Sequence, residues 1–295
     1  MDARGQAADS NLVRRVGFAV VAIPVALLIV WYGGLPLVLL LAVAAALATR
    51  ELFALAERQQ IRPARVIGLA SAATLAPLAY ATIAAPDVRA VVEVAWPYAA
   101  ALWLLAVLTW GLVARAPAER PLAAVAITVL AAAYTGALPA FVLDMRHHGH
   151  GLRSWAGAWL VFYPLVVTWV CDTAAMIGGR TIGGRKLAPS VSPGKTRSGS
   201  VAGVIGALLV APLFAWLVFP RAGIHVPLWQ LVAIAAVLGV VGQVGDLAES
   251  LFKREAGVKD SSRLIPGHGG VLDRLDSLYF VVPAAAAMYR LFGIT

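Results

Sequence analysis

Long apolar segments separated by short polar stretches run through almost the whole 295-residue chain. A helix needs about 20 apolar residues to cross the hydrocarbon core of a bilayer. The pattern therefore predicts an all-α, polytopic integral membrane protein with about nine transmembrane helices. We expect these helices at residues 16–32, 35–49, 66–85, 90–114, 121–143, 155–178, 201–219, 228–248 and 275–293.

The first apolar segment follows Arg14 and Arg15, as the apolar part of a signal peptide would. The residues that end it, Trp31-Tyr32-Gly33-Gly34, do not form a small-residue cleavage site. We therefore interpret it as a retained first span behind a cytoplasmic tail at 1–15. Residues 16–295 are then a single membrane domain, with its chemistry mainly in 172–276.

Composition and charge support this interpretation. Hydrophobic residues make up 61% of the chain and charged residues 13%, against about 45–50% apolar and about 25% charged in soluble domains. Of the 24 Lys and Arg residues, 19 fall in the N-terminal tail and in the loops after even-numbered spans. This bias predicts a cytoplasmic N-terminus and places the polar loops 179–200 and 249–274 on the cytoplasmic face. It also explains the net charge of +9 without a nucleic-acid partner.

Carboxylates stand at both ends of the last polar loop. Asp246 lies at the end of the eighth segment, and Asp273 and Asp276 open the ninth. If the two helices form a hairpin, the three carboxylates converge, and oxygen ligands of this kind suit Mg²⁺. The spacing leaves an alternative open, in which these acids pair with neighbouring arginines and cap the ninth helix.

Glycines and cations form two further candidate anion sites. The turn Pro266-Gly267-His268-Gly269-Gly270 precedes a helix start, where backbone N–H groups attract phosphate. A second cluster runs from Asp172 through Ser192-Pro193-Gly194-Lys195-Thr196 to Gly199, with small residues alternating with cations. Such a loop suits a triphosphate. It is equally typical of an ordinary basic loop beside anionic lipid.

The two polar loops together resemble a known family. Residues 250–276 contain Ser250-x-x-Lys253-Arg254-x₄-Lys259-Asp260 and then Pro266-Gly267-His268-Gly269-Gly270-x-x-Asp273-Arg274-x-Asp276. This stretch is similar to the signature of phosphatidate cytidylyltransferases, also called CDP-diglyceride synthetases. The loop Ser192-Pro193-x-Lys195-Thr196-x-x-Gly199 resembles the family's second conserved loop. It departs from the family at Arg197 and Ser198, where an aromatic and an acidic residue are usual.

The resemblance implies an enzyme that joins CTP to phosphatidate, giving CDP-diacylglycerol and pyrophosphate with Mg²⁺, in a bacterial cytoplasmic (inner) membrane. The implied partners are CTP, phosphatidate and membrane lipids, while a second cation and a homodimer stay open. The expected metal ligands are Asp246, Asp273 and Asp276, with Asp172 as a further candidate. The expected catalytic residues are Asp246, Asp273, Asp276, Lys253 and Lys259. The expected substrate-binding residues are Ser192, Lys195, Thr196, Arg254, Asp260, His268, Gly269 and Arg274.

Three other functions are alternatives to this one. A transporter would explain acidic residues near membrane depth, but the polar groups gather on one face and no inverted repeat is visible. A CDP-alcohol phosphotransferase would need an acidic pattern that the chain lacks, and an inactive scaffold stays open. Outside the polar loops, His147, His148 and His150 predict a solvated loop rather than a metal site. Cys171 predicts a small buried hydrophobe.

Overall fold

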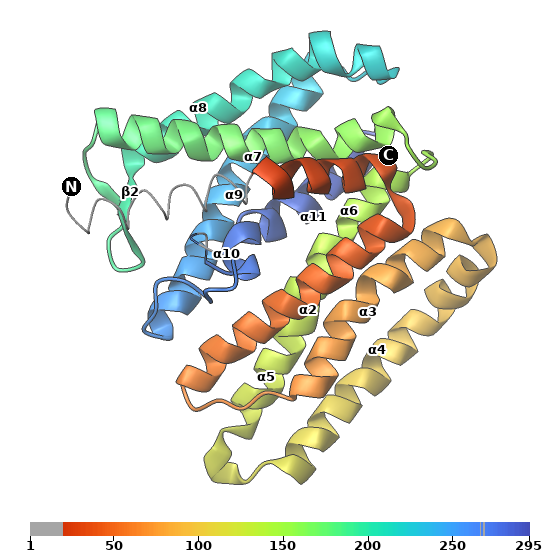
Figure 1. Ribbon diagram of the computed structural model, residues 1–295, viewed down its shortest axis with the longest axis vertical. Helices are drawn as coiled ribbons and strands as arrows, with labels where there is room; N and C mark the ends of the chain where they lie inside the picture. The colour runs from red at the N-terminus through yellow and green to blue at the C-terminus, as the bar shows by residue number, and fades with distance from the viewer. Residues whose placement is uncertain (1–19, 266, 268) are drawn as a thin grey trace.

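The computed structural model describes residues 20–265, 267 and 269–295, and the described chain is almost entirely helical (Figure 1). The helices are α2 (Gly34–Arg58), α3 (Arg65–Ala84), α4 (Pro86–Ala114), α5 (Pro121–Ala131), a π-helical segment (Ala132–Ala137), α6 (Leu138–His147), α7 (Trp155–Thr181), α8 (Arg197–Leu213), a second π-helical segment (Phe214–Val218), α9 (Leu228–Glu255), α10 (Val271–Leu275) and α11 (Leu278–Leu291). Short 3₁₀ turns cover Pro117–Glu119 and Pro220–Ala222, and two strands, β1 (Lys186–Ala188) and β2 (Ser192–Thr196), form an antiparallel hairpin.

Seven helices of the described chain are long and apolar enough to cross a membrane. They are α2, α3, α4, the continuous helix Pro121–His147, α7, the helix Arg197–Val218 and α9. This confirms the all-α, polytopic membrane architecture predicted from the apolar pattern. The second predicted span, the shortest by sequence, continues to Arg58.

Among the described residues, seven helices have full spanning length, whereas the sequence predicted about nine spans. At the C-terminal end, the predicted span 275–293 is interrupted after Leu275, and α11 has only 14 residues. The polar pair Asp276 and Ser277 lies at the interruption, which separates the short α10 from the apolar α11. At the other end, the described part of the predicted first span is the shorter apolar helix Val20–Tyr32.

Close packing of α7 against α8 shapes the region that holds the second polar loop. A Cβ added at Gly206 would lie 2.6 Å from the Ala174 Cβ, so glycine is needed for this approach. Cys171 is buried at the same interface, and its Sγ lies 3.5 Å from the Gly239 oxygen of α9. Figure 1 shows α7 and α8 side by side across the top of the view, with α9 beside them. Asp172, the residue after Cys171, is thereby fixed next to α9.

The C-terminal elements return along α9. After α9 ends at Glu255, the loop 256–270 leads into α10, and α11 packs against both α9 and α6. The 250–276 signature begins on α9 and ends just after α10. These elements therefore form the hairpin that we expected to bring their carboxylates together.

The histidine-containing segment is only partly the solvated loop that we predicted, because His148 is exposed and His150 half-buried, whereas Arg146 and His147 are buried. Arg146 is fully buried, and its guanidinium donates to the carbonyl oxygens of Val30, Trp31 and Gly151 at 2.6–3.0 Å. The His147 Nε2 accepts from the Gly34 backbone N–H at 3.0 Å. These contacts satisfy backbone groups at the junction of two helices, where free carbonyls and N–H groups would otherwise be buried. The role of these two side chains is structural.

Candidate active site

A cavity of about 610 Å³ opens between α7, the β-hairpin, α8, α9 and α10. Its lining combines charged groups with apolar ones and includes these residues predicted from the sequence: Asp172, Lys195, Thr196, Asp246, Asp273, Arg274 and Asp276. Arg180 and Gln243 also line it, and Trp169 and Met176 form an apolar part of the wall. The carboxylates of two distant polar loops therefore share one cavity with three cations.

The β-hairpin carries Lys195 into the cavity. Its register pairs Lys186 with Thr196, and the Thr196 hydroxyl accepts from the Gly199 N–H at 3.1 Å, capping α8. Held between the hairpin and this cap, Lys195 places its Nζ 2.7 Å from the Asp246 Oδ2. The acid of α9 is thus paired with a lysine of the preceding loop, not with an arginine of its own loop.

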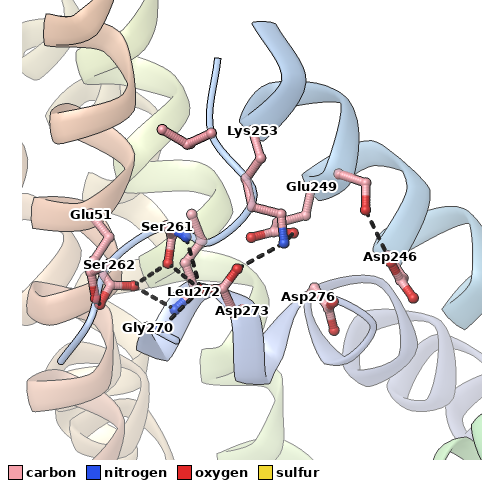
Figure 2. Close-up of polar contacts among 12 residues, drawn as sticks. Glu51, Asp246, Glu249, Lys253, Ser261, Ser262, Gly270, Leu272, Asp273 and Asp276 are labelled. Carbon is pink, nitrogen blue, oxygen red and sulfur yellow. Dashed lines mark hydrogen bonds and ion pairs between the residues drawn. The ribbon is translucent and has the colours of Figure 1, made fainter. Parts of the chain in front are cut away.

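A buried ion cluster lies behind the cavity wall (Figure 2). The Lys253 Nζ lies 2.7 Å from the Asp273 Oδ1 and also pairs with Glu249, one turn earlier on α9. Lys253 is buried, and it does not line the cavity. Because a buried ammonium needs compensating charge, the two carboxylates stabilise it there, and Lys253 ties α10 to α9.

Asp273 has partners on both oxygens. Besides Lys253 on Oδ1, its Oδ2 accepts from the Ser261 N–H at 2.9 Å, the Ser261 hydroxyl at 2.7 Å and the Gly270 N–H at 2.7 Å. Burial alone would raise its pKa, but Lys253 and these donors outweigh burial and hold the pKa of Asp273 below its ordinary value. Asp273 therefore caps the N-terminus of α10 as an ionised carboxylate.

Asp276 is in a different electrostatic environment. Burial, followed by the nearby charge of Asp246, raises the pKa of Asp276 to about 6. Its Oδ1 accepts from the Ser277 N–H at 2.6 Å. Figure 2 shows Asp276 between Asp273 and Asp246, and Asp172 lines the same cavity from α7. This part of the cavity is electronegative, and a bound cation would stabilise it.

The cavity acids fit a divalent cation that arrives with a phosphate ligand. Within the described residues, no three His, Cys, Asp or Glu side chains are close enough to form a preformed metal site. Mg²⁺ is usually held by one or two carboxylates together with substrate phosphates and water, so a preformed cage is not required. Asp246, Asp276 and Asp172 supply suitable oxygen atoms, although Asp246 already contacts Lys195 and the Ser250 hydroxyl. Asp273 is more fully engaged, with Lys253 on one oxygen and Ser261 and Gly270 on the other.

Several predicted site residues lie outside the cavity lining. Arg254 is exposed and donates to the backbone oxygens of Val191 and Val258, at 3.2 and 2.7 Å, which ties the end of α9 to the hairpin. Lys259 and Asp260 are exposed in the loop after α9. Ser192 starts β2 and is not part of the lining, and Gly269 lies in the turn before α10. His268 falls outside the described residues.

Two residues that the sequence analysis did not single out contribute to this region. Glu51, on α2, is buried and accepts four hydrogen bonds from the loop before α10 and from α10 itself. Gln243 lines the cavity, and its side-chain amide donates to the Ser200 oxygen at 3.2 Å, which links α9 to α8. In the sequence Glu51 follows Arg50 just after the apolar run 35–49, so the local pattern gave no signal that its side chain is buried.

The fold and the cavity define a polytopic membrane protein with a charged pocket built from the loops and helix ends of its C-terminal half. The chain belongs to the cytidylyltransferase family, whose model matches residues 13–292. It is similar to proteins named phosphatidate cytidylyltransferase: 43% identical over 152 residues to that of Haemophilus influenzae, 47% over 133 residues to that of Brucella suis and 38% over 169 residues to that of Bacillus subtilis. These matches cover 50%, 45% and 57% of this chain and 50%, 46% and 60% of the relatives, so the chain spans about half the length of the curated relatives it matches.

Proposed function

We propose that the protein is a phosphatidate cytidylyltransferase that converts CTP and phosphatidate into CDP-diacylglycerol and pyrophosphate. The observation that carries the proposal is the cavity itself, in which Asp172, Asp246 and Asp276 face Lys195 and Arg274 beside apolar side chains. Membership of the family and the names of the relatives support the same reaction.

The reaction brings two anions together. An oxygen of the phosphatidate phosphate forms a bond to the α-phosphorus of CTP, and the bond from that phosphorus to the bridging oxygen breaks, so that pyrophosphate leaves. The lipid phosphate is already ionised near neutral pH, and the attack therefore needs no general base. Substitution at phosphorus of this kind depends mainly on positioning and on electrostatic stabilisation.

The cavity provides both requirements. Lys195, Arg180 and Arg274 offset the repulsion between the substrates and the charge that develops on the leaving pyrophosphate. Asp246 and Asp276, with Asp172, would hold Mg²⁺, which when bound supplies further positive charge to the phosphates. Trp169 and Met176 are each about half exposed at the wall, which suits the apolar part of a lipid substrate.

The position of the protein in the cell is part of the proposal. The excess of basic residues in alternate loops supports a cytoplasmic location for the cavity, on the side of the membrane where CTP is available. The bacterial sources of the relatives support the inner membrane.

The test is direct. Purified protein in detergent is incubated with phosphatidate, CTP and Mg²⁺, and the lipid product is identified by mass spectrometry. The proposal predicts CDP-diacylglycerol and an equal amount of pyrophosphate. Absence of CDP-lipid from folded protein, with phosphatidate and Mg²⁺ in excess, would contradict it.

A further inference from the structure

Glu51 is an unusual acid, because it is buried in a membrane-spanning helix and, among the described residues, its hydrogen-bond donors are all neutral. Its carboxylate accepts from the Ser261 hydroxyl at 3.0 Å, the Ser262 hydroxyl at 2.7 Å, the Val271 N–H at 3.1 Å and the Leu272 N–H at 2.8 Å. Among the described residues, it takes part in no ion pair. The Ser261 hydroxyl has a single proton, which the Glu51 and Asp273 carboxylates share, so Ser262 and the two backbone N–H groups are the donors that Glu51 has to itself.

Two of those donors are the free N–H groups at the start of α10. The residue just before α10, Gly270, has no side chain to cap them, so the carboxylate of a distant helix performs the capping. A five-residue helix cannot fix its own position by internal hydrogen bonds. Contacts of this kind therefore determine where α10 lies, and α10 carries Asp273 and leads directly into Asp276.

Ser261 connects Glu51 to the cavity. Its hydroxyl lies 3.0 Å from the Glu51 Oε2 and 2.7 Å from the Asp273 Oδ2, and its backbone N–H also donates to Asp273. Asp273 in turn pairs with Lys253 on α9. A continuous polar chain thus runs from α2 through Ser261 and Asp273 to α9, and Figure 2 shows it from left to right.

The glycines of the turn make this arrangement sterically possible. A Cβ at Gly270 would collide with the Glu51 Oε2 and the Ser261 hydroxyl. A Cβ at Gly269, where φ is +80°, would lie 2.6 Å from the Asp273 Oδ2. The space beside these two glycines is therefore filled by the protein's own carboxylates.

We propose that Glu51 is a positioning residue for cytidylyl transfer, which holds α10 so that Asp276 faces Asp246 across the cavity. Glu51 does not line the cavity and does not touch substrate. The kinetic effects that we expect from replacing Glu51 rest on the proposed function. The structural effects rest on the hydrogen bonds alone.

The kinetic experiment compares Glu51→Gln with Glu57→Gln, a matched control on the same helix whose carboxylate pairs with the surface residue Arg65. Loss of an outer-shell partner typically costs about 10–100-fold in metal affinity or activity. For Glu51→Gln we expect a kcat lowered by that factor and a raised Mg²⁺ requirement, with the KM for CTP changed less than about threefold. Glu57→Gln should match the wild type.

A serine pair provides a second test that does not alter the charge in the membrane helix. Ser261 contacts both Glu51 and Asp273, whereas Ser262 contacts Glu51 but not Asp273. Ser261→Ala should therefore raise the Mg²⁺ requirement more than Ser262→Ala does. The proposal would be overturned if Ser261→Ala and Glu51→Gln both kept the wild-type Mg²⁺ requirement and the wild-type kcat.

Hydrogen exchange separates this inference from the proposed function, because it needs no turnover. In Glu51→Gln, but not in Glu57→Gln, at least one of the Val271 and Leu272 amides should exchange at least about tenfold faster, because the Gln side chain keeps one acceptor oxygen where the carboxylate had two. Unchanged exchange there would contradict the positioning role even in an active enzyme. Faster exchange in a protein that makes no CDP-lipid would support the positioning role while contradicting the proposed function.

Discussion

The Lys195 ammonium lies 2.7 Å from the Asp246 carboxylate and joins the β-hairpin to α9 at the wall of the cavity. Both side chains are about 30% exposed, so the pair faces the space where a charged ligand would enter. When a ligand binds, this ion pair can separate, so that Lys195 contacts the phosphates and Asp246 contacts the metal ion. The hairpin is therefore as important to the site as the signature stretch on α9 and α10.

Removing the Lys195 charge should damage the reaction specifically. Loss of one preorganised electrostatic donor typically costs about 10²–10³ in turnover, and we expect Lys195→Ala to lower kcat/KM for CTP by this factor. Lys186→Ala is the matched control, because Lys186 lies on the same hairpin, is exposed and does not line the cavity. Steady-state assays with varied CTP measure the effect, and a Lys195→Ala variant as active as Lys186→Ala would exclude a phosphate-binding role.

The raised pKa of Asp276, about 6, predicts a pH-dependent Mg²⁺ requirement. Above this pH the carboxylate is ionised and able to bind a cation, and below it a proton competes for the same oxygens. The Mg²⁺ concentration for half-maximal activity should rise as pH falls through 6, approaching about tenfold per pH unit if one proton competes. Titrations at pH 7.5 and 5.5 measure this, and identical Mg²⁺ requirements at both would contradict a metal role for Asp276.

Arg146 should control stability and not chemistry. Its buried guanidinium donates to three backbone oxygens, of which that of Val30 is buried, and hydrogen bonds to charged groups contribute about 1.5–3 kcal/mol each. Arg146→Ala should therefore lower the free energy of unfolding by about 3 kcal/mol or more, while the folded fraction keeps its turnover. Thermal unfolding in detergent tests this against Arg153→Ala, an exposed neighbour. An unchanged melting temperature for Arg146→Ala would contradict the structural role.

Residues whose chemistry is conspicuous against an apolar background could be predicted from the sequence. Asp246 stands out because an apolar span ends there, and the hairpin of α9 with α10 and α11 follows from two apolar segments joined by a polar loop. The role of Lys253 could not be predicted, because its alignment with Glu249 on one helix face does not reveal that Asp273 folds back onto it. Glu51 was missed because its partners, such as Ser261, lie 210 residues further along the chain. A local sequence pattern does not indicate contacts between residues so far apart in the chain.

The break before α11 illustrates the same limit. Hydropathy alone joins Leu275 to the apolar residues that follow, but Asp276 and Ser277 are drawn into the polar region around α9. Whether such a polar pair begins a span or interrupts one depends on tertiary partners, which set the environment of each carboxylate.

The central claim is that the acids lining this cavity carry out cytidylyl transfer, and replacing Asp246 tests it most directly. The measurement is the amount of CDP-diacylglycerol, quantified by mass spectrometry, that Asp246→Asn forms from phosphatidate and CTP at saturating Mg²⁺. Asp260→Asn, an exposed acid of the 250–276 signature outside the cavity lining, is the control. We predict at least about a 10²-fold loss for Asp246→Asn and turnover close to wild type for Asp260→Asn. Wild-type turnover in a folded Asp246→Asn protein would contradict the account.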